Sequence, residues 1–346
     1  MKTVNYGIGV LSLIIAGAAA ARGDNQQTLI VTASNTASNQ LLIYSPSGVL
    51  LKQIPTQGQG GVSGNAGGIA QDRDRLAAVN FGSGNVSIFA KDAAHVALRF
   101  ERLIPSITSP VSVAFGHGHL YVLTTSHIES HRIDHNGVNP DADGAAALIV
   151  ADGSAAQVGT LPDQLIISEK SNVIETVNLN SHGAVAGAAT LVANIPSNVN
   201  APFGLATRGN DAYVTIAHAN EISLVRNDAV LKVTGSGSQN APCWVTLDGP
   251  FLFSANSPSR SVSRYAVYGQ QIIQDAAVVA SFNGNPTDIT YRADLAAVVD
   301  GDGALSHVSV FHVDEDGNFT LKGVATINNA ATNGIAIVQP DEEFDN

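Results

Sequence analysis

The sequence predicts an all-β fold, a seven-bladed β-propeller of four-stranded blades, and three observations carry this prediction. A pattern of one small or proline residue, an apolar strand, a tight turn and a second apolar strand recurs along the chain. Glycine is abundant, at 33 residues, as many short strands joined by tight turns require. The repeats begin 40–46 residues apart, which is the period of a propeller blade, at Gly67, Pro110, Ala156, Pro202, Pro242 and Pro286.

The two ends of the chain support the same fold, because together they complete the ring. Residues 28–48 contain a second and a third strand but no first strand, and residues 332–338 contain a first strand with nothing after it. Together they form a seventh blade, shared between the N- and C-terminal strands, and this closure removes the free sheet edges. One domain is therefore expected over residues 28–339, followed by an acidic tail over residues 340–346 that is expected to be disordered.

The first 21 residues have the composition of a secretory signal peptide. Lys2 supplies a positive charge, and the apolar run Ile8–Ala21 ends in small residues and is too short to span a bilayer. A secreted, extracellular protein without membrane insertion is therefore expected. The single cysteine, Cys243, cannot form an intramolecular disulfide, so the core must stabilise the chain.

The chain is acidic, with a formal net charge of −12. A surface of this sign repels phosphate backbones and anionic lipid headgroups, which argues against nucleic acid as a partner. We expect a monomer whose partner is a small-molecule ligand or substrate.

The propeller geometry indicates where such a ligand would bind. The turn that enters each first strand and the loop after each second strand lie on one face, at the mouth of the central channel. Glu169 can act there as a general base, and Lys170 can hold an anion. The alternative for this pair is a structural role between blades. His127 and His218, in equivalent loops, can transfer protons near neutral pH, or can be ordinary solvated loop residues.

Further side chains expected at this mouth are polar or aromatic and would bind the substrate. No cofactor and no metal ligand set are expected. The alternative is a divalent cation held by Asp300, Asp302 and Asp288 with channel carbonyls, although Asp-Gly pairs also form ordinary turns. The expected substrate-binding residues are Asn80, Asn256, Arg264, Trp244, Phe203, Asp288 and Asp300.

Several motifs stand at the starts of first strands and near the ends of second strands. They are Ala201-Pro202-Phe203-Gly204, Ala241-Pro242-Cys243-Trp244, Ala255-Asn256 with Ser261–Tyr265, Ser168-Glu169-Lys170 with Asn172, and Pro286-Thr287-Asp288. These motifs resemble those of the lactonase/3-carboxymuconate-cyclase-like seven-bladed propellers, in particular the secreted branch, and the resemblance covers most of the chain after residue 27. It implies a lactone hydrolase or a cycloisomerase that acts on a small lactone or carboxylate at the channel mouth.

The chain departs from that family in two respects, and these leave a second hypothesis open. It has no His-x-His-Ser segment. The similar His117-Gly118-His119 lies in a different place, the turn between a first and a second strand. Few arginines stand where they would converge on a substrate carboxylate. The alternative is a non-catalytic secreted scaffold or surface antigen that recognises a glycan, a protein or a small ligand.

Overall fold

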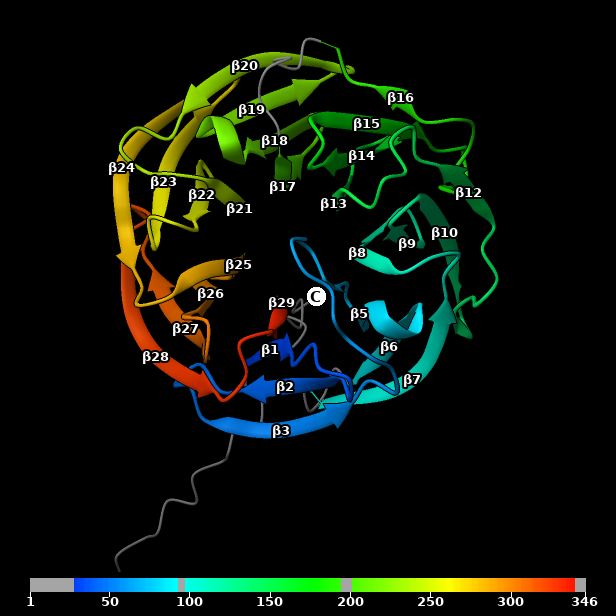
Figure 1. The fold of residues 1–346 in the computed structure, drawn as a ribbon, viewed down its shortest axis with the longest axis horizontal. Helices are drawn as coiled ribbons and strands as arrows, with labels where there is room; N and C mark the ends of the chain where they lie inside the picture. Colours follow the sequence, from blue (N-terminus) through cyan, green and yellow to red (C-terminus); the bar gives the residue numbers. More distant parts are fainter. Residues whose placement is uncertain (1–27, 93–96, 194–200, 340–346) are drawn as a thin grey trace, which may run out of the picture.

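The computed structural model describes residues 28–92, 97–193 and 201–339, which form seven sheets around a central channel (Figure 1). The predicted fold class is confirmed. The signal peptide predicted over residues 1–21 and the acidic tail predicted over residues 340–346 lie outside the described residues. The described residues contain no helix that is long and apolar enough to cross a membrane.

Five blades consist of four consecutive antiparallel strands, ordered from the channel to the rim. Their bounds are as follows: blade 2, β4 (Ile69–Gln71), β5 (Arg75–Asn80), β6 (Asn85–Asp92) and β7 (Ala97–Pro105); blade 4, β13 (Ala155–Thr160), β14 (Gln164–Glu169), β15 (Val173–Asn178) and β16 (Thr190–Leu191); blade 5, β17 (Pro202–Arg208), β18 (Asp211–Ile216), β19 (Glu221–Arg226) and β20 (Ala229–Gly235); blade 6, β21 (Pro242–Asp248), β22 (Phe251–Asn256), β23 (Ser261–Tyr268) and β24 (Gln271–Ser281); blade 7, β25 (Asn285–Arg292), β26 (Leu295–Gly301), β27 (Ser306–Val313) and β28 (Phe319–Ile327).

Blade 3 differs at its rim, where two short strands pair with the same third strand. It contains β8 (Pro110–Gly116), β9 (His119–Thr124), β10 (His127–Asp134), β11 (Gly137–Val138) and β12 (Gly144–Ala147).

Blade 1 closes the ring with strands from both ends of the described chain, as predicted. Its order is β29 (Asn333–Val338), β1 (Leu29–Ala33), β2 (Gln40–Tyr44) and β3 (Leu50–Pro55). The last strand pairs antiparallel with the first, with Leu29 opposite Val338. The ring is therefore closed by main-chain hydrogen bonds between segments about 300 residues apart in the chain.

The core lies between the blades, because both faces of each sheet are covered by a neighbour. In β26, Ala296 and Val298 pack towards blade 6, whereas Ala297 and Val299 pack towards blade 1. Successive side chains of a strand point to opposite faces, so a strand buried on both faces is a continuous apolar run. This explains the apolar second strands in the sequence repeats.

The alternating strand directions give the ring two distinct faces. The loop face carries the starts of the first strands and the loops after the second strands, and the hairpin face carries the turns between first and second strands. Two single-turn 3-10 helices, Phe81–Ser83 and Ala217–Ala219, lie in loops on the loop face.

Candidate functional site

A glycine-rich segment closes the channel mouth on the loop face. We call residues 58–68 the plug, and Figure 1 shows it as the blue loop that reaches the centre of the ring. The indole Nε1 of Trp244 donates to Asn65 O at 3.1 Å, and the main-chain N of Ala66 donates to Ala156 O at 3.1 Å. Val113 N donates to Gly67 O at 2.9 Å. The plug is therefore held by blades 3, 4 and 6, and it occupies the place where we expected a ligand.

Lys170 holds the plug rather than standing open at the mouth. Its Nζ donates to Gly64 O at 2.6 Å, and burial lowers the pKa of its ammonium group. The adjacent Glu169 is fully buried, and its Oε2 accepts a hydrogen bond from Ser154 Oγ at 2.8 Å. Its Oε1 has no hydrogen-bond partner among the described residues. Burial raises the pKa of Glu169 to about 8, so the carboxyl is mostly protonated at neutral pH.

Asn80 and Asn256 each end a second strand, and each donates a hydrogen bond to a serine of the third strand. We call this asparagine–serine pair a bracket. Asn80 Nδ2 donates to Ser87 Oγ at 2.7 Å, and Asn256 Nδ2 donates to Ser263 Oγ at 2.8 Å. Both asparagines are fully buried, and the Asn80 Oδ1 also accepts from Thr56 Oγ1 at 2.7 Å. These positions give no support to the predicted substrate-binding role, because the amide groups are used inside the sheet.

The two predicted histidines lie on the loop face, in different blades. His127 begins β10, is half-buried, and its Nδ1 lies 2.9 Å from Ser126 Oγ. His218 is exposed in the short helix Ala217–Ala219. Neither histidine lines any of the four described cavities, so their proton-transfer role stays a prediction.

Arg264 does not lie at the mouth. Its Nε donates to Asp275 Oδ1 at 3.0 Å, and the guanidinium stacks 5.0 Å from the centre of the Phe251 ring. Its Nη1 donates to Asn318 Oδ1 at 3.2 Å, in the turn before β28 on the hairpin face. This arginine therefore joins blade 6 to blade 7, and its position does not support the predicted contact with a substrate anion.

Three predicted residues do converge, below the plug. Phe203 and Trp244 are buried and make an edge-to-face contact with ring centroids 5.2 Å apart. Trp244 and Asp288 both line a channel cavity of about 220 Å³, together with Gln157, which the sequence analysis did not single out. Because inner strands of several blades contribute to this cavity, no short sequence motif could have indicated its lining.

The Asp288 carboxyl is the chemically distinctive group of the channel cavity. It is 8% exposed, and its one hydrogen bond within the described residues comes from Ile289 N at 2.8 Å. Burial raises its pKa to about 7. The Gln157 Oε1 accepts from Leu205 N at 2.7 Å, which leaves the Gln157 amide hydrogens as donors. Thr246 also lines the cavity, so the arrangement offers one base and several hydrogen-bond donors.

Asp300 lies elsewhere, between blades 6 and 7, beside His307. It is 3% exposed, and it does not line the channel cavity with Asp288. Within residues 28–92, 97–193 and 201–339, no three His, Cys, Asp or Glu side chains are grouped so that they can hold a metal ion. The alternative of a channel cation therefore has no ligand set in this part of the chain.

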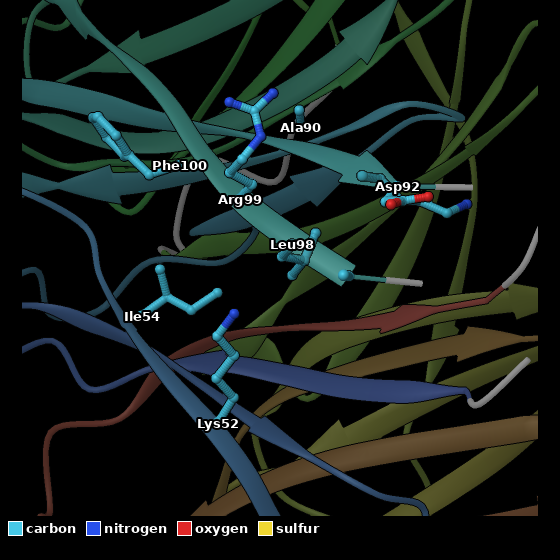
Figure 2. A pocket seen from close by; sticks show the side chains of 9 residues that line it. Lys52, Ile54, Ala90, Asp92, Leu98, Arg99 and Phe100 are labelled. Atoms are coloured by element: carbon cyan, nitrogen blue, oxygen red, sulfur yellow. The ribbon is translucent and has the colours of Figure 1, made fainter. Parts of the chain in front are cut away.

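A larger cavity, of about 610 Å³, lies at the rim between blades 1 and 2 (Figure 2). Lys52 on β3 and Arg99 on β7 lie on opposite sides of it in the view, with the apolar Ile54 and Leu98 between them. None of the predicted site residues lines this cavity. Its lining contains basic side chains but no buried carboxyl that could act as a base. The channel cavity is therefore the stronger candidate, although it is smaller.

The comparisons with known proteins agree on the fold. No protein-family model matches the chain, and no curated protein matches it. The structure is similar to a periplasmic gluconolactonase from Pseudomonas aeruginosa, with 14% identity, a TM-score of 0.64, and coverage of 90% of this chain and 99% of that chain. It is also similar to a candidate 6-phosphogluconolactonase from Bacteroides fragilis, with 14% identity, a TM-score of 0.63, and coverage of 92% and 99%.

A third similar structure has a different chemistry. It is a virginiamycin B lyase from Staphylococcus aureus, with 13% identity, a TM-score of 0.54, and coverage of 80% of this chain and 92% of that chain. At such identities the likeness shows the fold alone. The chain therefore has the propeller fold that gluconolactonases adopt, with a channel cavity of its own beneath a plug.

Proposed function

We propose that the protein hydrolyses small lactones in the channel cavity, with Asp288 as the general base. The observation that carries this proposal is the Asp288 carboxyl, which is buried, lines the cavity and has a pKa of about 7. A general base is most effective when its pKa lies near the working pH. The fold of the gluconolactonases supports the choice of substrate class.

The chemistry needs one water molecule and no other reactant. Ionised Asp288 accepts a proton from water as the water oxygen attacks the lactone carbonyl carbon. The Gln157 amide, which lines the same cavity, donates a hydrogen bond to the carbonyl oxygen as negative charge develops there. The acyl C–O bond of the ring then breaks, and the ring oxygen takes the proton from Asp288. The product is an open hydroxy acid.

The size of the cavity favours a single-ring substrate. Its volume of about 220 Å³ is below the roughly 300–1,000 Å³ of typical small-molecule sites. The plug covers the loop face, so in this proposal the substrate enters from the hairpin face, opposite to the mouth expected from sequence. The secreted location stays part of the proposal, and it predicts a mature N-terminus after residues 18–21.

The decisive experiment compares two buried carboxyls. Asp288→Asn is expected to lower kcat/KM for gluconolactone by about 100-fold or more, because it removes the base with little change in shape. Asp300→Asn, a buried aspartate outside the channel, is the matched control and is expected to retain the activity. Equal loss in both variants, or no turnover by the wild-type protein above the spontaneous rate, would reject the proposal.

The second candidate function is a non-catalytic scaffold that binds a small ligand. It is favoured by one observation: Lys170, Asn80 and Asn256 are engaged by the plug and the brackets. In that case gluconolactone binds without turnover, and Asp288→Asn changes the affinity only. Cyclisation of an unsaturated carboxylate, the other reaction of the resembled family, is tested by the same pair of variants with such a substrate.

A further inference from the structure

A second cavity lies in the groove between blades 6 and 7, apart from the channel. Its volume is about 230 Å³. Phe282 and Phe311 form one wall, with ring centroids 6.0 Å apart and the rings at 90°. Leu321 contributes a further apolar surface at the rim, and it is 56% exposed. The cavity therefore has an aromatic interior that is accessible from outside.

An aspartate–histidine pair forms the polar end of this cavity. The Nδ1 of His307 lies 3.2 Å from Asp300 Oδ1, which also accepts a hydrogen bond from Gly284 N at 3.1 Å. Gly284 lies so close that a Cβ there would be 2.4 Å from the same oxygen, so any side chain at position 284 would displace the carboxylate. An ionised carboxylate can only accept, so Nδ1 is the donor of this pair and Nε2 is the ring nitrogen left for a ligand. The side chain of His307, 18% exposed, lines the cavity.

Blades 2 and 6 show what this position does where an asparagine replaces the aspartate. Asn85, Ser261 and His307 each stand opposite the second-strand residue Asn80, Asn256 or Asp300. Two residues further along the third strand, Ser87, Ser263 and Ser309 are therefore equivalent. Ser223 holds the same place in blade 5, because Glu221 stands opposite Ile216, and its buried hydroxyl has no hydrogen-bond partner within the described residues. Ser87 Oγ donates to Thr56 O at 2.5 Å, and Ser263 Oγ donates to Ala277 O at 2.7 Å. The equivalent residue in blade 7 is Ser309.

Ser309 differs from Ser87 and Ser263, because its hydroxyl makes no hydrogen bond within the described residues. Unlike Ser223, whose hydroxyl is buried, it lines the cavity. The bracket that is closed by hydrogen bonds in blades 2 and 6 is therefore open in blade 7. Two polar groups that the fold does not use, the Nε2 of His307 and the hydroxyl of Ser309, face one space with two phenylalanine rings.

We propose that this cavity is a second ligand site, which binds a small neutral phenol through His307 and Ser309. The lone pair of His307 Nε2 accepts the phenolic hydrogen, and the Ser309 hydroxyl donates to the phenolic oxygen. The aromatic ring of the ligand packs on Phe282 and Phe311, where edge-to-face contacts are favourable. Anionic ligands are repelled by Asp300 and by Asp302 in the adjoining loop.

The test is calorimetric titration of the full protein with p-cresol at neutral pH. We expect saturable binding of one molecule per chain. The methyl ether 4-methylanisole has the same ring but no donor, and it is expected to bind at least about tenfold more weakly. p-Toluate, an anion of the same size, is expected not to bind. Equal affinities of p-cresol and 4-methylanisole would overturn the proposal.

Two variants locate the site without disturbing the aspartate–histidine pair. Leu321→Trp fills the cavity from its exposed rim, and we expect it to lower the affinity for p-cresol by about tenfold or more. Ser309→Ala is expected to lower it about threefold, through loss of one hydrogen bond. Ser263→Ala, the equivalent serine of blade 6, is the matched control and should bind as the wild type does. Unchanged binding by Leu321→Trp would place the ligand elsewhere and refute the assignment.

Discussion

The plugged mouth of the channel and the cavity beneath it each contain one buried carboxyl with a raised pKa. Glu169, at the mouth, has a pKa of about 8, and Asp288, in the cavity, has a pKa of about 7, and burial is the main cause for both. Of these two carboxyls, Asp288 is the one that lines a described cavity large enough for a small molecule. Burial thus raises the pKa of both groups, and the two differ in whether a ligand can reach them.

The difference follows from what surrounds each carboxyl. Glu169 accepts a hydrogen bond from Ser154 and precedes Lys170, whose ammonium group fastens the plug. Asp288 accepts one hydrogen bond, from the next residue of its own strand, and otherwise faces the channel. A perturbed pKa is evidence for a functional site only where the geometry also admits a reactant.

The largest expected effect is the pH dependence of lactone hydrolysis. Below the pKa of about 7, protonation of Asp288 removes the base, so kcat/KM should fall tenfold for each pH unit and reach a plateau above that pKa. Initial rates corrected for spontaneous hydrolysis measure this profile. An inflection near pH 8 that disappears in Glu169→Gln would instead identify Glu169 as the base and reverse the comparison.

The next effect concerns stability. The pKa of Glu169 is raised from 4.5 to about 8 on folding, so the folded chain holds a proton that the unfolded chain releases. The resulting stabilisation is fully present below pH 4.5 and is lost as pH rises through about 8. Glu169→Gln keeps a neutral side chain at every pH, so we expect it to abolish this loss, which amounts to several kcal/mol at about 1.4 kcal/mol for each pKa unit. Urea unfolding at a series of pH values measures the difference, and parallel curves for both proteins would contradict it.

The smallest effect is on the plug itself. Lys170→Met removes the hydrogen bond to Gly64 O, and the amides of residues 58–68 should exchange with solvent up to about tenfold faster. Hydrogen exchange followed by mass spectrometry measures this change. Lys322→Met, at an exposed position of β28, is the control and should leave the exchange rates of the plug unchanged. Unaltered exchange in Lys170→Met would show that Trp244 and the main-chain contacts suffice.

Much of the fold was predictable, because its signals are local. A buried apolar run such as Leu295–Val299, with turn residues beside it, stands in the second strand of each repeat. It indicates a strand whose two faces are both covered. The half-repeats at the two ends predicted the blade that β29 and β1 share. Asp288 and Trp244 were also predicted for the site, because they follow the start of a first strand.

The remaining features of the site were beyond local patterns. Residues 58–68 have no periodicity, so nothing in them indicated a plug that contacts three distant blades. Asn256 and Asp300 occupy the same place in their repeats, yet one closes a bracket and the other borders a cavity.

The sequence by itself determined the blades, since strand alternation and turn chemistry act over a few residues. The tertiary structure alone decided which polar groups keep an open space beside them, because that depends on contacts between segments far apart in the chain.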